Sequence, residues 1–147
     1  MSPLKKMSEL EERIYRIIKE PQLMPLATVC ETGKPWVRYI TGWGSEDLII
    51  RFVTSIRSRK VGQIKSNPEV HLTCGARAAE PTAHYLQISG KAEITRDNEE
   101  RLRYWQDELK AFFSGPDDPN YCICIVKPYR IEYCRMTEVN PEVWEQD

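Results

Sequence analysis

The chain lacks the long apolar segments and the histidine clusters that mark several classes of protein. No apolar run approaches the roughly 18 residues that a membrane-spanning helix needs, and the start, MSPLKKMSELEE, has no apolar core of a secretory signal. We therefore expect a cytoplasmic protein without a membrane partner. Because His71 and His84 are the only histidines, a metal-binding cluster is hard to assemble, and we expect no metal site.

The cysteines also argue against a cross-linked or zinc-binding fold. Their number is odd and no C-x-x-C spacing occurs, which disfavours both a disulfide framework and a zinc knuckle. Cys122 and Cys124 would share one face of a strand, because side chains alternate along a strand with a period of two. We expect the cysteines to be small buried hydrophobic residues. They are Cys30, Cys74, Cys122, Cys124 and Cys134.

No conventional catalytic motif is present. The chain has no G-x-S-x-G elbow, no phosphate-binding Walker loop and no pair of carboxylates at a telling spacing. The catalytic residues, if the protein is an enzyme, are therefore unknown from the sequence.

Charge is balanced overall but unevenly distributed. Residues 1–65 contain 12 Lys and Arg against 7 Asp and Glu, whereas residues 66–147 contain 9 against 15, and the net charge is −1. The asymmetry is typical of a basic half with an anionic partner; alternatively, folding interleaves the halves and no basic face remains. Nucleic-acid binders usually have a clearly basic domain, so we expect no nucleic-acid partner.

The length and the hydrophobic pattern predict one mainly β domain over residues 1–147, with peripheral helices. Ser8 and Glu11 fit a capping box at the start of a first helix, which Pro21 ends. A short helix is expected over 58–66, and Asp97 opens another whose apolar stripe runs through Phe112. Turns connect most strands, so a small barrel is the natural closure. The expected strands are 23–31, 35–41, 48–54, 69–75, 84–95 and 121–134, the last interrupted at Lys127-Pro128 and followed by a polar tail.

The segment TSIRSRKVGQI, residues 54–64, concentrates hydroxyls and cations where a strand turns into a helix. The start of a helix presents unpaired N–H groups and the positive end of its dipole, which together favour anions. Arginine and lysine next to it suit a phosphate group. A phosphate monoester is thus the most economical ligand, and the alternative is a solvated basic helix face. The side chains concerned are Thr54, Ser55, Arg57, Ser58, Arg59 and Lys60.

Arg38 adds a further cation in the strand PWVRYITG. It would share the face of Trp36 and Ile40, and an arginine on an apolar strand face needs an anionic partner because burying an unpaired charge is costly. The alternatives are an edge position in solvent or an internal carboxylate.

The order of these motifs resembles one family along about residues 20–147. ATVCETGKPWVRYI, LIIRFVTSIRSRKVGQIKSNPEVHLTC, YLQISGKAEI and KPYRIEYC are similar to the flavin-binding split barrels of the pyridoxamine 5′-phosphate oxidase type. GPDDPNY and PEVWE look like the general stress protein branch. The resemblance implies a six-stranded split barrel that forms a homodimer, with two FMN sites at the interface.

The resemblance also implies roles for individual residues. Arg38 and Lys60 would contact the FMN phosphate, supported by Ser58 and Arg59, while Val53 and Thr54 would contact the isoalloxazine ring and ribityl chain. Tyr85 stands where the oxidases usually have Gln. Trp43 and Trp144, large aromatics in an expected turn and tail, indicate an interface, and Trp144 would cover the flavin of the partner subunit. The cofactor-binding set is Arg38, Val53, Thr54, Ser58, Arg59, Lys60, Tyr85 and Trp144.

The oxidase features that bind substrate are missing. Trp43 replaces a Lys for the substrate phosphate, Cys134 replaces a Trp, and the terminal RMTEVNPEVWEQD lacks an Arg-x-His segment. We therefore expect an FMN-dependent oxidoreductase that exchanges electrons with another small molecule and does not oxidise pyridoxamine 5′-phosphate. The alternatives are a non-catalytic flavin carrier or sensor, and a deazaflavin- or haem-binding relative.

Overall fold

The computed structural model describes residues 6–147; the first five residues, which begin the segment predicted to contain no secretory signal, lie outside the described residues. Strands dominate, as the sequence predicts. The elements are α1 (Glu9–Ile18), β1 (Gln22–Val29), β2 (Pro35–Gly44), β3 (Ile50–Ser55), α2 (Arg59–Ser66), β4 (Glu69–Cys74), β5 (His84–Thr95), α3 (Asn98–Arg103), the 3₁₀ helix η1 (Asp107–Ala111), β6 (Tyr121–Arg135) and β7 (Glu142–Glu145).

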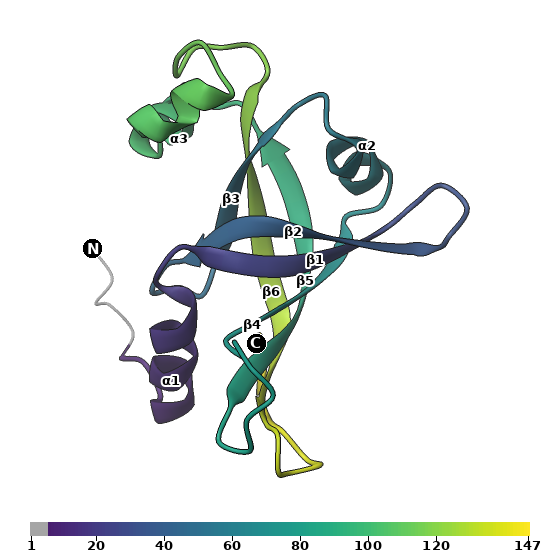
Figure 1. The fold of residues 1–147 in the computed structure, drawn as a ribbon, viewed down its shortest axis with the longest axis vertical. Helices are drawn as coiled ribbons and strands as arrows, with labels where there is room; N and C mark the ends of the chain where they lie inside the picture. Colours follow the sequence, from purple (N-terminus) through teal and green to yellow (C-terminus); the bar gives the residue numbers. More distant parts are fainter. Residues whose placement is uncertain (1–5) are drawn as a thin grey trace.

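Six antiparallel strands close into a barrel. The order is β3-β2-β1-β4-β5-β6, and β6 pairs back onto β3 from Ile50↔Val126 to Ser55↔Tyr121. Helix α1 lies toward the lower end of the view in Figure 1, and α2 and α3 lie toward the upper end. The predicted six-stranded barrel with peripheral helices is therefore confirmed. Within residues 6–147, the helices are all too short or too polar to cross a membrane.

Helix α1 covers one end of the barrel. The predicted capping box is present, since Ser8 Oγ accepts from the Glu11 N–H (3.1 Å) and Glu11 Oε1 accepts from the Ser8 N–H (2.9 Å). Ile14 and Ile18 are fully buried in the main core. Ile18 packs so closely on β2 that a Cβ at Gly44 would overlap its Cδ1 and Cγ1. A glycine is therefore required at this crossing.

The cysteines are largely buried, as expected. Cys74, Cys122, Cys124 and Cys134 are buried and Cys30 is half-buried, and all five are free thiols. Cys124 lies in the main core, whereas its neighbours Ile123 and Ile125 pack in a second cluster on the other face of β6. The small-hydrophobe interpretation is thus confirmed for four of the five.

The prediction of one helix from Asp97 through Phe112 is wrong beyond Arg103, where helix α3 ends. Consecutive side chains of an α-helix point about 100° apart, but Tyr104 packs on Trp43 of β2 and Trp105 packs on Tyr121 of β6. The helix ends so that both rings reach their partners, and η1 follows. Phe112, placed on the apolar stripe, is 79% exposed.

The end of the chain also differs from its prediction. Strand β6 continues through Lys127-Pro128 to Arg135, but its register on β5 shifts there: Ser89 pairs with Arg130 and Gly90 pairs with Pro128, which leaves Tyr129 of β6 without a partner residue on β5. Gly90 permits this close approach, since a Cβ there would lie 2.9 Å from the Lys127 carbonyl oxygen and 3.2 Å from Pro128 Cα. The expected polar tail contains β7, which pairs with the edge of β6 from Arg130↔Glu145 to Tyr133↔Glu142.

Strands β2 and β3 pair over only three residues each. Their register runs from Gly42↔Phe52 to Gly44↔Ile50, after which β2 continues along β1 and β3 continues along β6. Residues 36–41 of β2 and Val53–Ser55 of β3 therefore diverge, and α2 starts just beyond the end of β3. This divergence opens the barrel wall.

Candidate functional site

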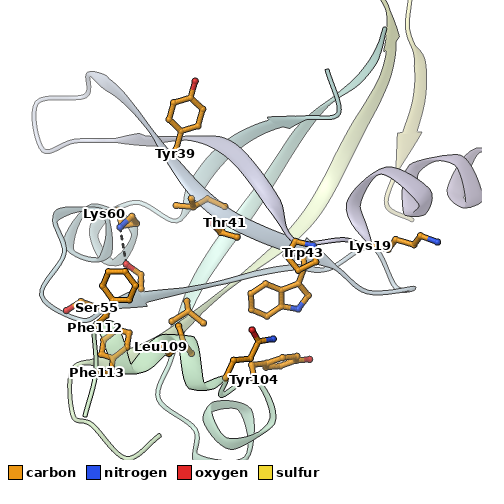
Figure 2. Close-up of a pocket in the computed structure, with 15 residues that line it drawn as sticks. Lys19, Tyr39, Thr41, Trp43, Ser55, Lys60, Tyr104, Leu109, Phe112 and Phe113 are labelled. Atoms are coloured by element: carbon orange, nitrogen blue, oxygen red, sulfur yellow. Dashed lines mark hydrogen bonds between the residues drawn. The ribbon is translucent and has the colours of Figure 1, made fainter. Parts of the chain in front are cut away.

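A cavity of about 630 Å³ occupies the divergence between β2 and β3. Figure 2 shows β2 above it, Lys60 at its left side, and the segment that carries α3 and η1 below it. Its polar and charged lining residues are Lys19, Tyr39, Thr41, Thr54, Ser55, Lys60, Tyr104 and Gln106, and its apolar ones are Pro21, Ile40, Trp43, Val53, Leu109, Phe112 and Phe113. Among residues 6–147, no carboxylate lines this space.

Lys60 reaches into the cavity from the first turn of α2. Its Nζ donates a hydrogen bond to Thr54 Oγ1 (3.0 Å), and Thr54 Oγ1 is 3.3 Å from Ser58 Oγ. Ser58 is the N-cap residue of α2 but its hydroxyl makes no capping hydrogen bond. Burial lowers the pKa of Lys60, and the nearby charge of Arg38 lowers it further. The surroundings of this amine therefore disfavour its charged form.

Arg38 projects from the same face of β2 as Ile40. Its guanidinium donates to Thr28 Oγ1 (2.7 Å), Gln63 Oε1 (2.9 Å) and the carbonyl oxygens of Leu26 (3.1 Å) and Trp36 (3.3 Å). All these acceptors are neutral. Burial lowers the pKa of Arg38, and the charge of Arg59 lowers it further.

Arg38 lies near enough to Lys60 for its charge to lower the pKa of that amine, although only Lys60 lines the cavity. In the described part of the chain, neither Arg38 nor Lys60 makes an ion pair, although other arginines do. Removing an unpaired charge from water costs free energy, so a bound anion would relieve both residues at once. Hydroxyls of Thr54 and Ser58 stand beside Lys60 as further donors. This donor set fits a phosphate group.

The other predicted residues on β3 and α2 lie in or beside this space. Val53, Thr54 and Ser55 line it directly. Arg59 lies further out, with its guanidinium 5.5 Å from the ring centroid of Trp36. Arg57 is exposed, and its N–H donates to Ser55 Oγ (3.2 Å).

Tyr85 and Trp144 lie away from this cavity within the chain. Tyr85 lines a second cavity of about 660 Å³, together with Leu23, Pro25 and Met136. Trp144 packs against the main core from β7, and its Nε1 donates to Glu11 Oε2 of the α1 helix (3.3 Å). Tyr39 lines both cavities.

Trp43 and Trp144 indicate an interface only if their side chains are exposed, and that exposure is not found. Both are partly buried, because Trp43 packs its ring 5.3 Å from that of Tyr104 and Trp144 packs beside α1. Large side chains that are exposed on the barrel lie on β1, β2 and β6: Leu23, Trp36, Val37, Tyr39 and Tyr129.

One whole wall of the cavity was missed from the sequence. Tyr104, Gln106, Leu109, Phe112 and Phe113 come from the segment that was predicted as a continuous helix. An apolar stripe of this kind is typical of a helix that packs on a core, and no local signal indicates that it faces a cavity on β2 and β3.

The fold and the cation-lined split define a class, and comparison with known proteins identifies it: the chain belongs to the pyridoxamine 5′-phosphate oxidase family, whose sequence pattern matches residues 10–135. It is 30% identical to general stress protein 26 of Bacillus subtilis (strain 168) over 133 residues, which are 90% of this chain and 94% of that protein. The structure of general stress protein 26 from Bacillus anthracis str. Sterne is similar with a TM-score of 0.80 and 27% identity, covering 95% of this chain and 100% of that one.

Two more distant structures, each 16% identical, share the fold. One is a pyridoxamine 5′-phosphate oxidase-related, FMN-binding protein of Nostoc punctiforme PCC 73102, with a TM-score of 0.63 over 85% of this chain and 81% of that one. The other is a haem-binding protein of Mycobacterium smegmatis, with a TM-score of 0.67 over 96% of this chain and 60% of that one. One barrel architecture therefore accompanies different cofactors in different proteins.

Proposed function

We propose that the protein binds FMN in the split between β2 and β3 and acts as an FMN-dependent oxidoreductase on a small molecule. The observation that supports this most directly is the pair of partly buried cations, Arg38 and Lys60, whose hydrogen-bond partners in the described part of the chain are all neutral. Membership of the family and an FMN-binding protein among its structural relatives support the same cofactor.

Two groups of residues would contact different parts of the cofactor. Lys60 and Arg38 would hold the phosphate, with Ser58 and Arg59 beside them. Val53 and Thr54, which line the cavity where β3 leaves β2, would contact the ring and the ribityl chain. The flavin supplies the electron-transfer chemistry when bound, and the chain supplies position and electrostatics.

We further propose that two copies pair through the outer face of β1 and β2. Leu23, Val37 and Tyr39 are 66%, 68% and 70% exposed and lie on one face, since Leu23 is opposite Thr41 and Pro25 is opposite Tyr39. Exposed apolar patches of this kind mark interaction sites. Because Tyr39 lines both cavities, a second copy here would bring its own residues to each flavin site. Tyr85 and Trp144 are the two we assign to that role.

The dimer is tested by light scattering on wild type and Tyr39→Glu. Wild type should have the mass of two chains, and a charge at the centre of the patch should give monomers that remain folded by circular dichroism. A wild-type monomer with flavin bound would remove the proposal.

The cofactor is tested first by the visible spectrum of the purified protein and by mass analysis of what denaturation releases, which separates FMN from deazaflavin and haem. Titration then compares FMN with riboflavin. A charge-assisted hydrogen bond contributes about 1.5–3 kcal/mol, so FMN should bind at least about tenfold more tightly. Equal affinities would contradict a phosphate site. Steady-state turnover with a reduced nicotinamide separates an enzyme from a non-catalytic carrier or sensor.

The protein should not oxidise pyridoxamine 5′-phosphate. Trp43 stands where the substrate-phosphate Lys of the oxidases is expected, and it packs on Tyr104 at the cavity wall. Correct orientation of reactants can supply about 7–11 kcal/mol of a barrier, so losing the substrate clamp is a large defect. An aerobic assay of FMN-loaded protein should detect no pyridoxal 5′-phosphate; turnover near about one per second would contradict this.

A further inference from the structure

We infer that the Trp43 side of the cavity binds a planar, uncharged aromatic molecule rather than a phosphorylated substrate. The inference rests on the proposed function, because it assigns the space that remains once a phosphate-bearing cofactor lies against Lys60. Figure 2 shows Lys60 on one side of the cavity and Trp43 with Tyr104 on the other.

The surface on this side is aromatic and apolar. The rings of Trp43 and Tyr104 are 5.3 Å apart with an interplanar angle of 51°, and Leu109 lines the cavity between them and Phe113. Flat rings stack on such surfaces in offset or tilted geometry with a gain beyond the area that is buried. A ligand with a planar ring uses this surface best.

Among the described residues, the charged side chains near Trp43 and Tyr104 are either paired or turned away from the two rings. Arg51 lies behind Tyr104, 5.5 Å from its ring centroid, and its Nε is 3.5 Å from Glu100 Oε2. Lys19 lines the rim, but its side chain is exposed and points away from Trp43. A charged substituent here would lose its hydration without gaining a free counter-charge.

Neutral polar groups are available instead. Gln106 and the hydroxyl of Tyr104 belong to residues that line the cavity, and each can donate or accept a hydrogen bond. They would orient a ring that has a hydroxyl or carbonyl substituent. The ligand class is thus a neutral aromatic ring with such a group.

The test titrates two probes that share a ring, 2-naphthol and 2-naphthyl phosphate, by calorimetry. The protein is used loaded with FMN and also without FMN in saturating inorganic phosphate, which occupies the cation side. In both forms 2-naphthol should bind about tenfold more tightly than its phosphate ester. FMN affinity is measured separately, so that a failure of the cofactor proposal is seen on its own.

Three variants locate the binding. Leu109→Ser should weaken 2-naphthol binding about fivefold, whereas Leu102→Ser, a similar loss at an exposed α3 position outside the cavity, should leave it unchanged. Trp43→Lys, which adds a cation, should reverse the preference toward 2-naphthyl phosphate. The inference is overturned if the ester binds as tightly as 2-naphthol to wild type, or if Leu109→Ser and Trp43→Lys both bind 2-naphthol as wild type does.

Discussion

At the junction of α1 and β7, Arg13 donates two hydrogen bonds to Glu142 (2.6 and 2.8 Å), and Arg135 donates a third (3.1 Å). Beside α2, by contrast, Arg38 and Lys60 contact only amide, hydroxyl and carbonyl oxygens. Both regions contain two cations close together. Among residues 6–147, only the first region supplies a carboxylate to its cations.

The charges at the α1–β7 junction are paired within the fold, whereas the cations beside α2 are available to a ligand. A salt bridge completed within one chain needs nothing further, and partly exposed pairs contribute little free energy. Partly buried cations with neutral partners are destabilised by each other, so a bound anion would contribute more there. Variants at the α2 region should therefore change binding, and variants at the α1–β7 junction should change stability.

The largest effect is expected for Lys60→Ala. Loss of a charge-assisted contact should weaken FMN binding by about 1.5–3 kcal/mol, which is about ten- to hundredfold, measured by flavin fluorescence titration. The melting temperature of the cofactor-free protein should not fall, because the variant removes a charge that faces Arg38. Lys65→Ala, on the last turn of the same helix with an exposed side chain, is the matched control and should bind FMN normally. Arg38→Ala should likewise weaken FMN binding without unfolding the chain.

A stability effect without a binding effect is expected for Gly44→Ala. The new methyl group would overlap Ile18, whose Cβ lies 2.9 Å from the added carbon in a fully buried position. Overpacking of this kind costs about 1–3 kcal/mol, measured by urea denaturation. Gly62→Ala is the control, since nothing lies within 4 Å of its added carbon; it should be neutral or stabilising by up to about 1 kcal/mol. Equal destabilisation by both would refute the packing argument.

A smaller loss of stability is expected for Arg13→Ala. The side chain makes the bidentate contact to Glu142 and lies 4.8 Å over the ring of Tyr133, but both partners of the ion pair are partly exposed. We expect the free energy of unfolding to fall by about 1 kcal/mol, with FMN affinity unchanged. If Arg13→Ala weakened FMN binding and left the free energy of unfolding unchanged, the α1–β7 junction would be a binding region and not a stabilising one, contrary to this proposal.

The smallest effect is a pH dependence that originates at Glu142. Hydrogen bonds from Arg13 and Arg135 lower the pKa of this carboxyl from 4.5 to about 2. The folded pKa lies below the unfolded one, so the contribution to stability is complete above pH 4.5 and is lost as the pH falls toward about 2. Denaturation midpoints across this range should fall less steeply for Glu142→Gln than for wild type. Parallel curves would show that the ion pair contributes nothing.

The elements that the sequence predicts well are those whose signals are local. The capping box of Ser8 and Glu11 and the strand 84–95 each depend on neighbouring residues, and both are confirmed. The short helix before Asn67-Pro68 is confirmed for the same reason. Strand β7 was missed because EVWE is short and acquires its partners only from the edge of β6.

The candidate site was predicted in part for a related reason. Arg38 and the basic segment after β3 could be recognised as candidate site residues, because an arginine on an apolar strand face and a cluster of cations are both unusual. Tyr104 could not be recognised as a cavity residue from the sequence. Its partner Trp43 is distant in the chain, and we attribute the end of the helix before Tyr104 to the contact between these two rings. Binding of an anion at this site remains a prediction. The absence of an internal carboxylate partner for Arg38, by contrast, is observed among the described residues.

The pairing of β3 with β6 has a consequence for the order of folding. It joins residues 50–55 to residues 121–126, which are far apart in the sequence, so we expect closure of the barrel to be a late step. Contacts between such distant residues form slowly, because the loop-closure entropy is lost before they contribute. We expect the cavity wall formed by β3 to be completed only at that late step. A ligand held between β2 and β3 would therefore bind only chains that have completed it, and would slow their reopening.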